Sequence, residues 1–142
     1  MKTLEEKQAA EDQLQQEKEP VNYDTREYPV EVLIEKFNND EFVIPKYQRD
    51  FVWEKDVEKM SKFIESILLD LPIPYLFFAD DLDTGKLEIV DGSQRIRTLR
   101  KFTNNEFKLD GLEVLDLFND FKFQDLLESR QRRFMRKTLR SI

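Results

Sequence analysis

Residues 87–102 read LEIVDGSQRIRTLRKF, and this stretch decides the fold. The run LEIV at 87–90 is typical of a strand, because aliphatic and β-branched residues favour that conformation. The pair Asp91-Gly92 interrupts the strand, and apolar residues then recur at helical spacing at Ile96, Leu99 and Phe102. We therefore predict a strand, a tight turn and a helix. The first N–H groups of a helix have no partner inside it, so this turn is a natural anion site.

The side chains of this turn suit phosphate and magnesium. Gly92 has no side chain where a phosphate would approach the backbone, and Arg95 carries a planar fork for phosphate oxygens. Ser93 can cap the helix or donate to a phosphate, and Asp91 is a hard oxygen ligand for magnesium. The alternative is a tight turn with a capping serine, in which Arg95 is a buried ion-pair partner of a carboxylate such as Asp91. The spacing alone leaves both interpretations open.

A second group of polar and aromatic residues lies at 44–53, in the sequence IPKYQRDFVW. Tyr47, Phe51 and Trp53 supply aromatic surface, and the planar side chains of Gln48 and Arg49 form bidentate hydrogen bonds. Such a segment can stack on a base and bind a phosphate. It can equally close the hydrophobic core, with Arg49 paired to a nearby carboxylate.

The flanking residues predict an α+β fold with a mixed sheet and packed helices. Short apolar runs at 42–45, 75–79 and 87–91 are expected to form one sheet, the last two as a hairpin around the turn at 80–85. We expect 75–79 to be a buried strand. Asp56 is a plausible N-cap for a helix over 57–70. Its core-facing stripe has the spacing of an amphipathic helix and consists of Val57, Met60, Phe63, Ile64, Ile67, Leu68 and Leu71.

Other segments give weaker signals. A helix after Pro29 is predicted from Val30, Leu33, Ile34 and Phe37, and it should end at 38–40. A short strand is expected at 107–109 and a helix within 123–135, with Phe118, Phe121 and Phe123 packing at the edge of the core. Residues 1–19 have high helix propensity without an apolar stripe, so we expect a solvated helix that ends at Pro20.

These patterns predict two parts in the chain. Residues 1–28 form a charged N-terminal segment, as a solvated helix or disordered, and residues 29–142 form one domain with its core at 29–110 and a helical part at 111–142. The 142 residues are enough for one such domain.

Composition and charge exclude several classes of protein. The chain has no His and no Cys, which excludes catalytic triads with histidine, cysteine nucleophiles, disulfides and thiolate zinc sites. No apolar run approaches the length of a membrane span, and the charged N-terminus does not resemble a signal peptide, so we expect a cytoplasmic protein. The net charge is -7, but residues 128–142 hold six basic residues and one acidic residue. This basic segment is either a solvated helix face or a contact for nucleic acid or phosphate.

The motifs together resemble a known family. They are IP at 44–45, YQR at 47–49 with Trp53, LPIP at 71–74, and VDGSQR at 90–95 with TL at 98–99. Their order and spacing are similar to the family called domain of unknown function 262, the N-terminal domain of GmrSD-type, modification-dependent restriction enzymes. That family is similar to the ParB/sulfiredoxin superfamily of small nucleotide-binding α+β folds. Its signature Asp-Gly-Gln-Gln-Arg has Ser93 in its third position here, and the shorter side chain favours binding over hydrolysis.

The resemblance implies a site, a ligand and partners. Asp91, Gly92, Ser93, Gln94 and Arg95 would bind the phosphates of a nucleoside triphosphate, with Gln48 and Arg49 facing them. Catalysis, where present, would rest on Asp91 as the magnesium ligand and on Arg95 as the charge stabiliser. Many members carry an HNH nuclease domain with a catalytic His, which this chain lacks, so the nuclease would be a separate domain or subunit. DNA is a further expected partner. The alternatives are a binding module for DNA or protein without turnover, and an interaction adaptor that retains the fold without the ligand.

Overall fold

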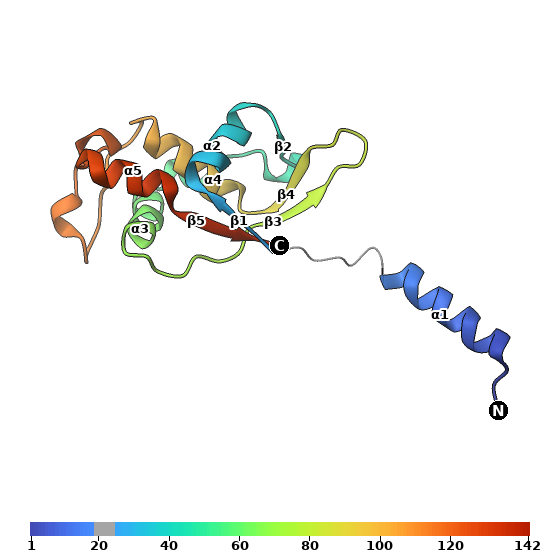
Figure 1. Cartoon of the computed structure of the whole chain (residues 1–142). Helices are drawn as coiled ribbons and strands as arrows, with labels where there is room; N and C mark the ends of the chain where they lie inside the picture. Colours follow the sequence, from blue (N-terminus) through green and yellow to red (C-terminus); the bar gives the residue numbers. More distant parts are fainter. Residues whose placement is uncertain (19–24) are drawn as a thin grey trace.

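The strand–turn–helix unit predicted at 87–102 lies at the centre of the fold. The computed structural model describes residues 1–18 and 25–142. Strand β4 (Leu87–Asp91) leads through Gly92 directly into helix α4 (Ser93–Thr103), as Figure 1 shows. Gly92 has a φ of 112°, in the left-handed region that residues with a Cβ rarely adopt. This glycine lets the chain turn from the strand into the helix without an intervening loop.

A three-stranded mixed sheet surrounds β4, in the order β2-β4-β3. Strand β2 (Phe42–Val43) pairs parallel to β4, and β3 (Phe77–Asp80) pairs antiparallel to it with Phe78 opposite Ile89. The prediction of one sheet from these three runs is confirmed. The prediction that 75–79 is a buried strand is wrong in part, because β3 begins only at Phe77 and that side chain is exposed.

A second strand pair joins this sheet and was not predicted from the sequence. Strand β1 (Arg26–Pro29) runs antiparallel to β5 (Thr138–Ser141), so residues within the expected N-terminal segment belong to a sheet. The far edge of β5 lies against the residues that lead into β3. Leu76 N–H donates to the carbonyl of Arg140 at 2.8 Å, and Ile142 N–H donates to the carbonyl of Leu76 at 2.8 Å. The two strand pairings therefore meet at Leu76.

Helices α2 (Val30–Asn38) and α3 (Val57–Leu68) form where the apolar spacing predicts them. The Asp56 carboxylate accepts a hydrogen bond from Lys59 N–H at 3.1 Å, which confirms the predicted N-cap. The predicted core stripe of α3 is wrong at both ends, since Val57 and Leu71 are exposed. Val57 is the first residue of the helix, and Leu71 follows its end, where the chain has left the helical path.

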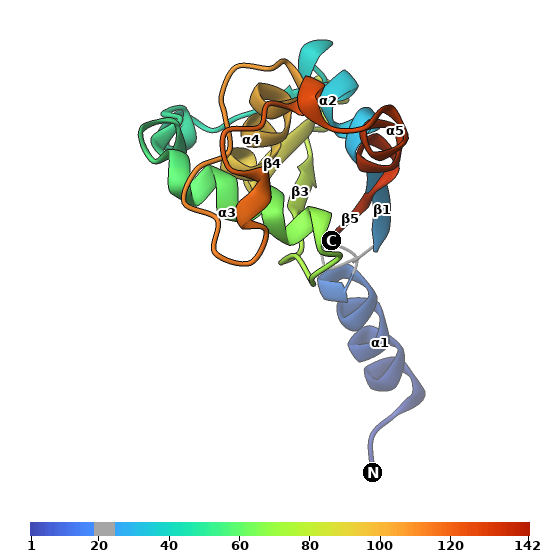
Figure 2. The same ribbon diagram turned by 90° about the vertical axis from the view of Figure 1, so that its left-hand side faces the viewer.

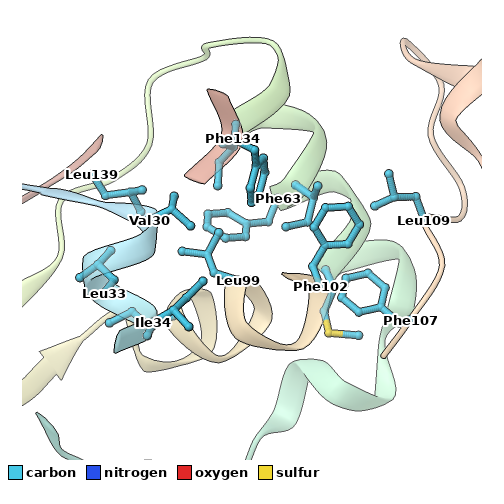
Figure 3. Close-up of a cluster of buried hydrophobic side chains, with 14 of the residues drawn as sticks. Val30, Leu33, Ile34, Phe63, Leu99, Phe102, Phe107, Leu109, Phe134 and Leu139 are labelled. Atoms are coloured by element: carbon cyan, nitrogen blue, oxygen red, sulfur yellow. The ribbon is translucent and has the colours of Figure 1, made fainter. Parts of the chain in front are cut away.

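The core gathers around one face of α4. Figure 3 shows Leu99 and Phe102 pointing into a cluster with Val30 and Phe134, and all four side chains are fully buried. The Phe102 ring lies 5.6 Å from the ring centroid of Phe134 and meets it edge-on. Because α4 contributes to the core along its length, its N-terminus is held on a rigid support.

The chain between α4 and β5 is mostly irregular. The predicted strand at 107–109 is wrong, because Leu109 bonds to Phe121 and Asp120 through its backbone and the ladder extends no further. Short 3₁₀ turns at Asp116–Phe118 and Phe123–Asp125 follow, and then helix α5 (Glu128–Arg136). The prediction that Phe118, Phe121 and Phe123 pack at the edge of the core is confirmed by their partial burial.

The N-terminal helix α1 (Leu4–Lys18) is exposed at every position from Leu4 to Glu17. Figure 1 shows it extending away from the folded body. A solvated helix was predicted here, and its expected end at Pro20 lies outside the described residues. Within 1–18 and 25–142, no helix is both long enough and apolar enough to cross a membrane.

Candidate functional site

A pocket of about 410 Å³ opens at the N-terminus of α4. One side is the strand–helix turn, and the other is the segment at 46–55, which folds as the 3₁₀ turns η2 (Lys46–Gln48) and η3 (Val52–Lys55). Ten residues line the pocket: Tyr47, Gln48, Asp50, Val52, Trp53, Asp91, Gly92, Ser93, Gln94 and Arg95. The two motif groups, 38 or more positions apart in sequence, therefore face each other across one cavity.

The start of α4 presents unused hydrogen-bond donors to this pocket. The first intrahelical bond runs from Ile96 N–H to the carbonyl of Gly92, so the N–H groups of Ser93, Gln94 and Arg95 have no acceptor among the described residues. Ser93 does not cap the helix, and its hydroxyl makes no hydrogen bond with any described residue although the residue is only 2% exposed. Unpaired donors at a helix start attract an anion, and the helix dipole adds to that attraction.

Gly92 is required by packing as well as by its backbone conformation. A Cβ at this position would lie 2.3 Å from Cδ2 of Leu76, far inside van der Waals contact. The predicted reason, close approach of a phosphate to the backbone, is not needed to explain this glycine. The position is fixed by the fold whether or not a ligand binds.

Arg95 is largely committed to the protein itself. Its guanidinium donates to the carbonyl of Pro74 and, at 3.4 Å, to that of Tyr75, and it lies 3.5 Å from the Asp91 carboxylate. Burial lowers the pKa of Arg95, and the charge of Asp91 opposes that shift in part. This geometry matches the ion-pair alternative considered from the sequence. Arg95 still borders the pocket.

Gln94 and Arg97 hold the opposite wall in place. The Gln94 side chain accepts from Trp53 N–H at 3.1 Å and donates to the carbonyl of Asp50 at 2.9 Å. Arg97 donates to the carbonyl of Arg49 at 2.6 Å, and burial followed by the nearby Arg100 lowers its pKa. These bonds use the side chains to position the segment at 46–55. Gln94 was expected to contact phosphate directly, but both its amide oxygen and its amide nitrogen are hydrogen-bonded to the protein.

The residues expected to face the site from 44–53 divide into two kinds. Gln48 lines the pocket and donates to the carbonyl of Val90 at 2.7 Å. Arg49 is exposed, lies outside the pocket lining, and its guanidinium has no partner among the described residues, so the expected carboxylate pairing is absent there. Tyr47 lines the pocket as an exposed residue, whereas Phe51 and Trp53 pack on the core and Trp53 borders the pocket as well.

Two carboxylates border the pocket, and one of them was not singled out from the sequence. Asp91 has a side chain that is 65% exposed, and Asp50 lies on the facing wall. Asp50 lies between Arg49 and Phe51, and the sequence pattern pointed to those two residues but not to the Asp50 carboxylate itself. Magnesium in nucleotide sites is held by one or two carboxylates plus substrate phosphates, which is the donor set available here. Among the described residues no group of three or more potential metal ligands occurs.

The fold and this pocket define a small α+β domain whose central helix α4 begins at a pocket. Residues 30–142 match the family described as the GmrSD restriction endonuclease, N-terminal domain. The match covers most of the chain, and the protein therefore belongs to this family. Neither a curated protein nor a solved structure matches the chain significantly.

Proposed function

We propose that this domain binds the phosphates of a nucleoside triphosphate at the N-terminus of α4 and regulates a DNA restriction or phage-defence system. The observation that carries the proposal is the unused hydroxyl of Ser93 beside three unpaired backbone N–H groups at one pocket. No described side-chain nitrogen or oxygen is buried without a partner, so the Ser93 hydroxyl reaches the open pocket, where it can donate to a phosphate oxygen. Family membership supplies the restriction context.

The charge around the pocket favours a nucleotide bound with magnesium. Arg95 contributes one positive charge, while Asp50 and Asp91 contribute two negative charges to the lining. A bare triphosphate would meet two carboxylates, and a divalent cation held by Asp91 would lower that repulsion. Bound there, magnesium would neutralise charge that develops on the transferred phosphoryl group. Asp91 would hold the ion, and the helix N-terminus would orient the phosphates.

The remaining parts of the proposal follow from the resemblance. We place the domain near the ParB/sulfiredoxin superfamily and the family called domain of unknown function 262, in the cytoplasm. Its partners would be DNA and a nuclease domain or subunit with an HNH motif. The absence of His from the sequence means that such nuclease chemistry has to come from outside these 142 residues.

Calorimetric titration of Ser93→Ala tests the phosphate site. The Ser93 hydroxyl has no partner in the fold, so its removal should leave the thermal midpoint within about 2 °C of the parent. A lost hydrogen bond to a charged oxygen should weaken magnesium–nucleotide binding about tenfold. Ser129→Ala, at an exposed position of α5, is the matched control and should bind as the parent does. A parent that binds no nucleoside triphosphate refutes the proposal and favours the adaptor.

Binding without turnover is the second candidate function. It is favoured because Arg95 and Gln94 are already bonded to the protein, which leaves few free groups for chemistry. Phosphate release by the magnesium-loaded protein separates the two. Release that Asp91→Asn abolishes supports hydrolysis, and tight binding without release supports a nucleotide-set conformation.

A further inference from the structure

Helix α5 carries arginines that the fold does not use. Four of the ten Arg residues of the chain lie within Glu128–Arg136, and the guanidinium groups of three of them, Arg130, Arg133 and Arg136, make no ion pair or hydrogen bond with any residue of 1–18 or 25–142. We call these three the arginine row. Their spacing of three residues places them next to one another along the helix surface.

The other basic residues of the C-terminal segment are structurally engaged. Lys137 pairs with Asp70, and Arg140 lies 3.0 Å from Glu27 and donates to the hydroxyl of Tyr75 at 3.4 Å. Arg132 lies 3.6 Å from Glu128 on the same helix. Gln131 donates inward to the carbonyl of Leu126 at 2.8 Å. The arginine row is thus a distinct set, because neighbouring polar side chains of similar length do find partners.

Stability does not account for the row. Cations near a helix C-terminus stabilise the helix dipole, but adjacent like charges at this spacing repel each other and reduce that gain. Arg133 and Arg136 are exposed and so do not cover the core, and Arg130 is only half-buried. A local excess of guanidinium groups over carboxylates is the arrangement that a polyanion would stabilise.

We propose that the arginine row binds the phosphate backbone of duplex DNA, independently of base sequence. Six residues separate its ends, so it spans about 9 Å of helix axis, against one phosphate per about 3.4 Å of each DNA strand. Guanidinium forks match phosphate oxygens better than ammonium groups do. Helix α5 lies at one end of the folded body, beside α2 (Figures 1 and 2), and a helix is about as wide as the major groove.

This surface is separate from the nucleotide pocket. Phe134 of α5 contacts Phe102 near the C-terminal end of α4, whereas the pocket lies at the N-terminal end of that helix. The nine residue steps from Ser93 to Phe102 correspond to about 14 Å of helix. The proposal goes beyond nucleotide binding and stands without it, since DNA and nucleotide would occupy opposite ends of α4.

The test is fluorescence anisotropy of the full chain with a labelled 20-base-pair duplex of arbitrary sequence. Between about 50 and 200 mM NaCl, three phosphate contacts give a slope of log affinity against log salt of about -2.7. The triple variant R130Q/R133Q/R136Q should lose at least about tenfold in affinity at the lowest salt, with a slope near zero. Its melting and nucleotide titration should match the parent, because the three side chains have no partners.

A charge-matched control separates a binding surface from net charge. Lys7, Lys86 and Lys108 are exposed on other parts of the chain, and K7Q/K86Q/K108Q changes the charge equally. This control should keep the parental slope. A parent that does not bind the duplex overturns the proposal, as does an arginine variant with parental slope or a control that loses as much. A parent that binds a labelled polyglutamate peptide and no duplex also overturns it. If the triple variant unfolds, the single variant R133Q is the test, and it should change the slope of log affinity against log salt by about 1.

Discussion

Replacing Arg95 by Ala should destabilise the folded domain by about 3 kcal/mol. The Arg95 side chain is 10% exposed, and the change removes the donors that the carbonyls of Pro74 and Tyr75 use. Hydrogen bonds from a charged donor contribute about 1.5–3 kcal/mol each, and the 3.4 Å bond to Tyr75 lies at the weak end. The Asp91 carboxylate is 65% exposed, so water replaces its lost partner and the ion pair adds less than about 1 kcal/mol.

Thermal and urea unfolding of Arg95→Ala measure this loss. For a domain of this size, about 3 kcal/mol lowers the melting temperature by roughly 10 °C. Arg49→Ala is the control, because that exposed guanidinium has no partner among the described residues, and it should melt within about 2 °C of the parent. Arg95→Lys should recover part of the loss, since an ammonium group reaches one carbonyl but lacks the fork. A melting temperature of Arg95→Ala within about 2 °C of the parent would refute the reasoning.

Three further predictions concern the supports of the pocket. Gly92→Ala should cost about 2–5 kcal/mol in urea unfolding, from backbone strain and the clash with Leu76, and a smaller cost in a Leu76→Ala background would confirm the clash. Gln94→Ala should raise amide hydrogen exchange at 46–55, where it removes two bonds to the backbone, and unchanged exchange there would contradict that role. Deletion of residues 1–18 should leave the melting temperature within about 2 °C, because α1 is exposed throughout Leu4–Glu17, and a large fall would show that the helix docks.

Local sequence patterns were sufficient for the elements that form from neighbouring residues. The helical stripe of α3 and the β3–β4 hairpin at 80–85 follow from spacing and turn residues a few positions apart. Strands β1 and β5 did not follow, because each has four residues and they pair across more than 100 positions. The alternation of buried Leu139 and Ser141 marks β5, but it is too short to recognise within a basic run.

The position of the strand–helix turn could be predicted from the sequence, whereas the hydrogen-bond partners of its side chains could not. A glycine between a strand and a helix locates the strand–helix turn, because that geometry is local. Whether Arg95 faces a ligand or the carbonyls of Pro74 and Tyr75 depends on a segment about 20 residues away. The engagement of Gln94 with the 46–55 segment likewise depends on tertiary contacts. Such roles are set by packing, which residue type alone does not reveal.

The contact between Leu76 and Gly92 links the anion turn to the far edge of the sheet. No space separates the two residues, since even one added carbon at Gly92 would overlap Leu76. Leu76 in turn is hydrogen-bonded on both sides of its peptide to Arg140 and Ile142. Close-packed interiors have no voids in which such a displacement could be absorbed. A shift of the turn toward Leu76 would therefore press on that side chain and, through its two hydrogen bonds, on the C-terminal strand β5.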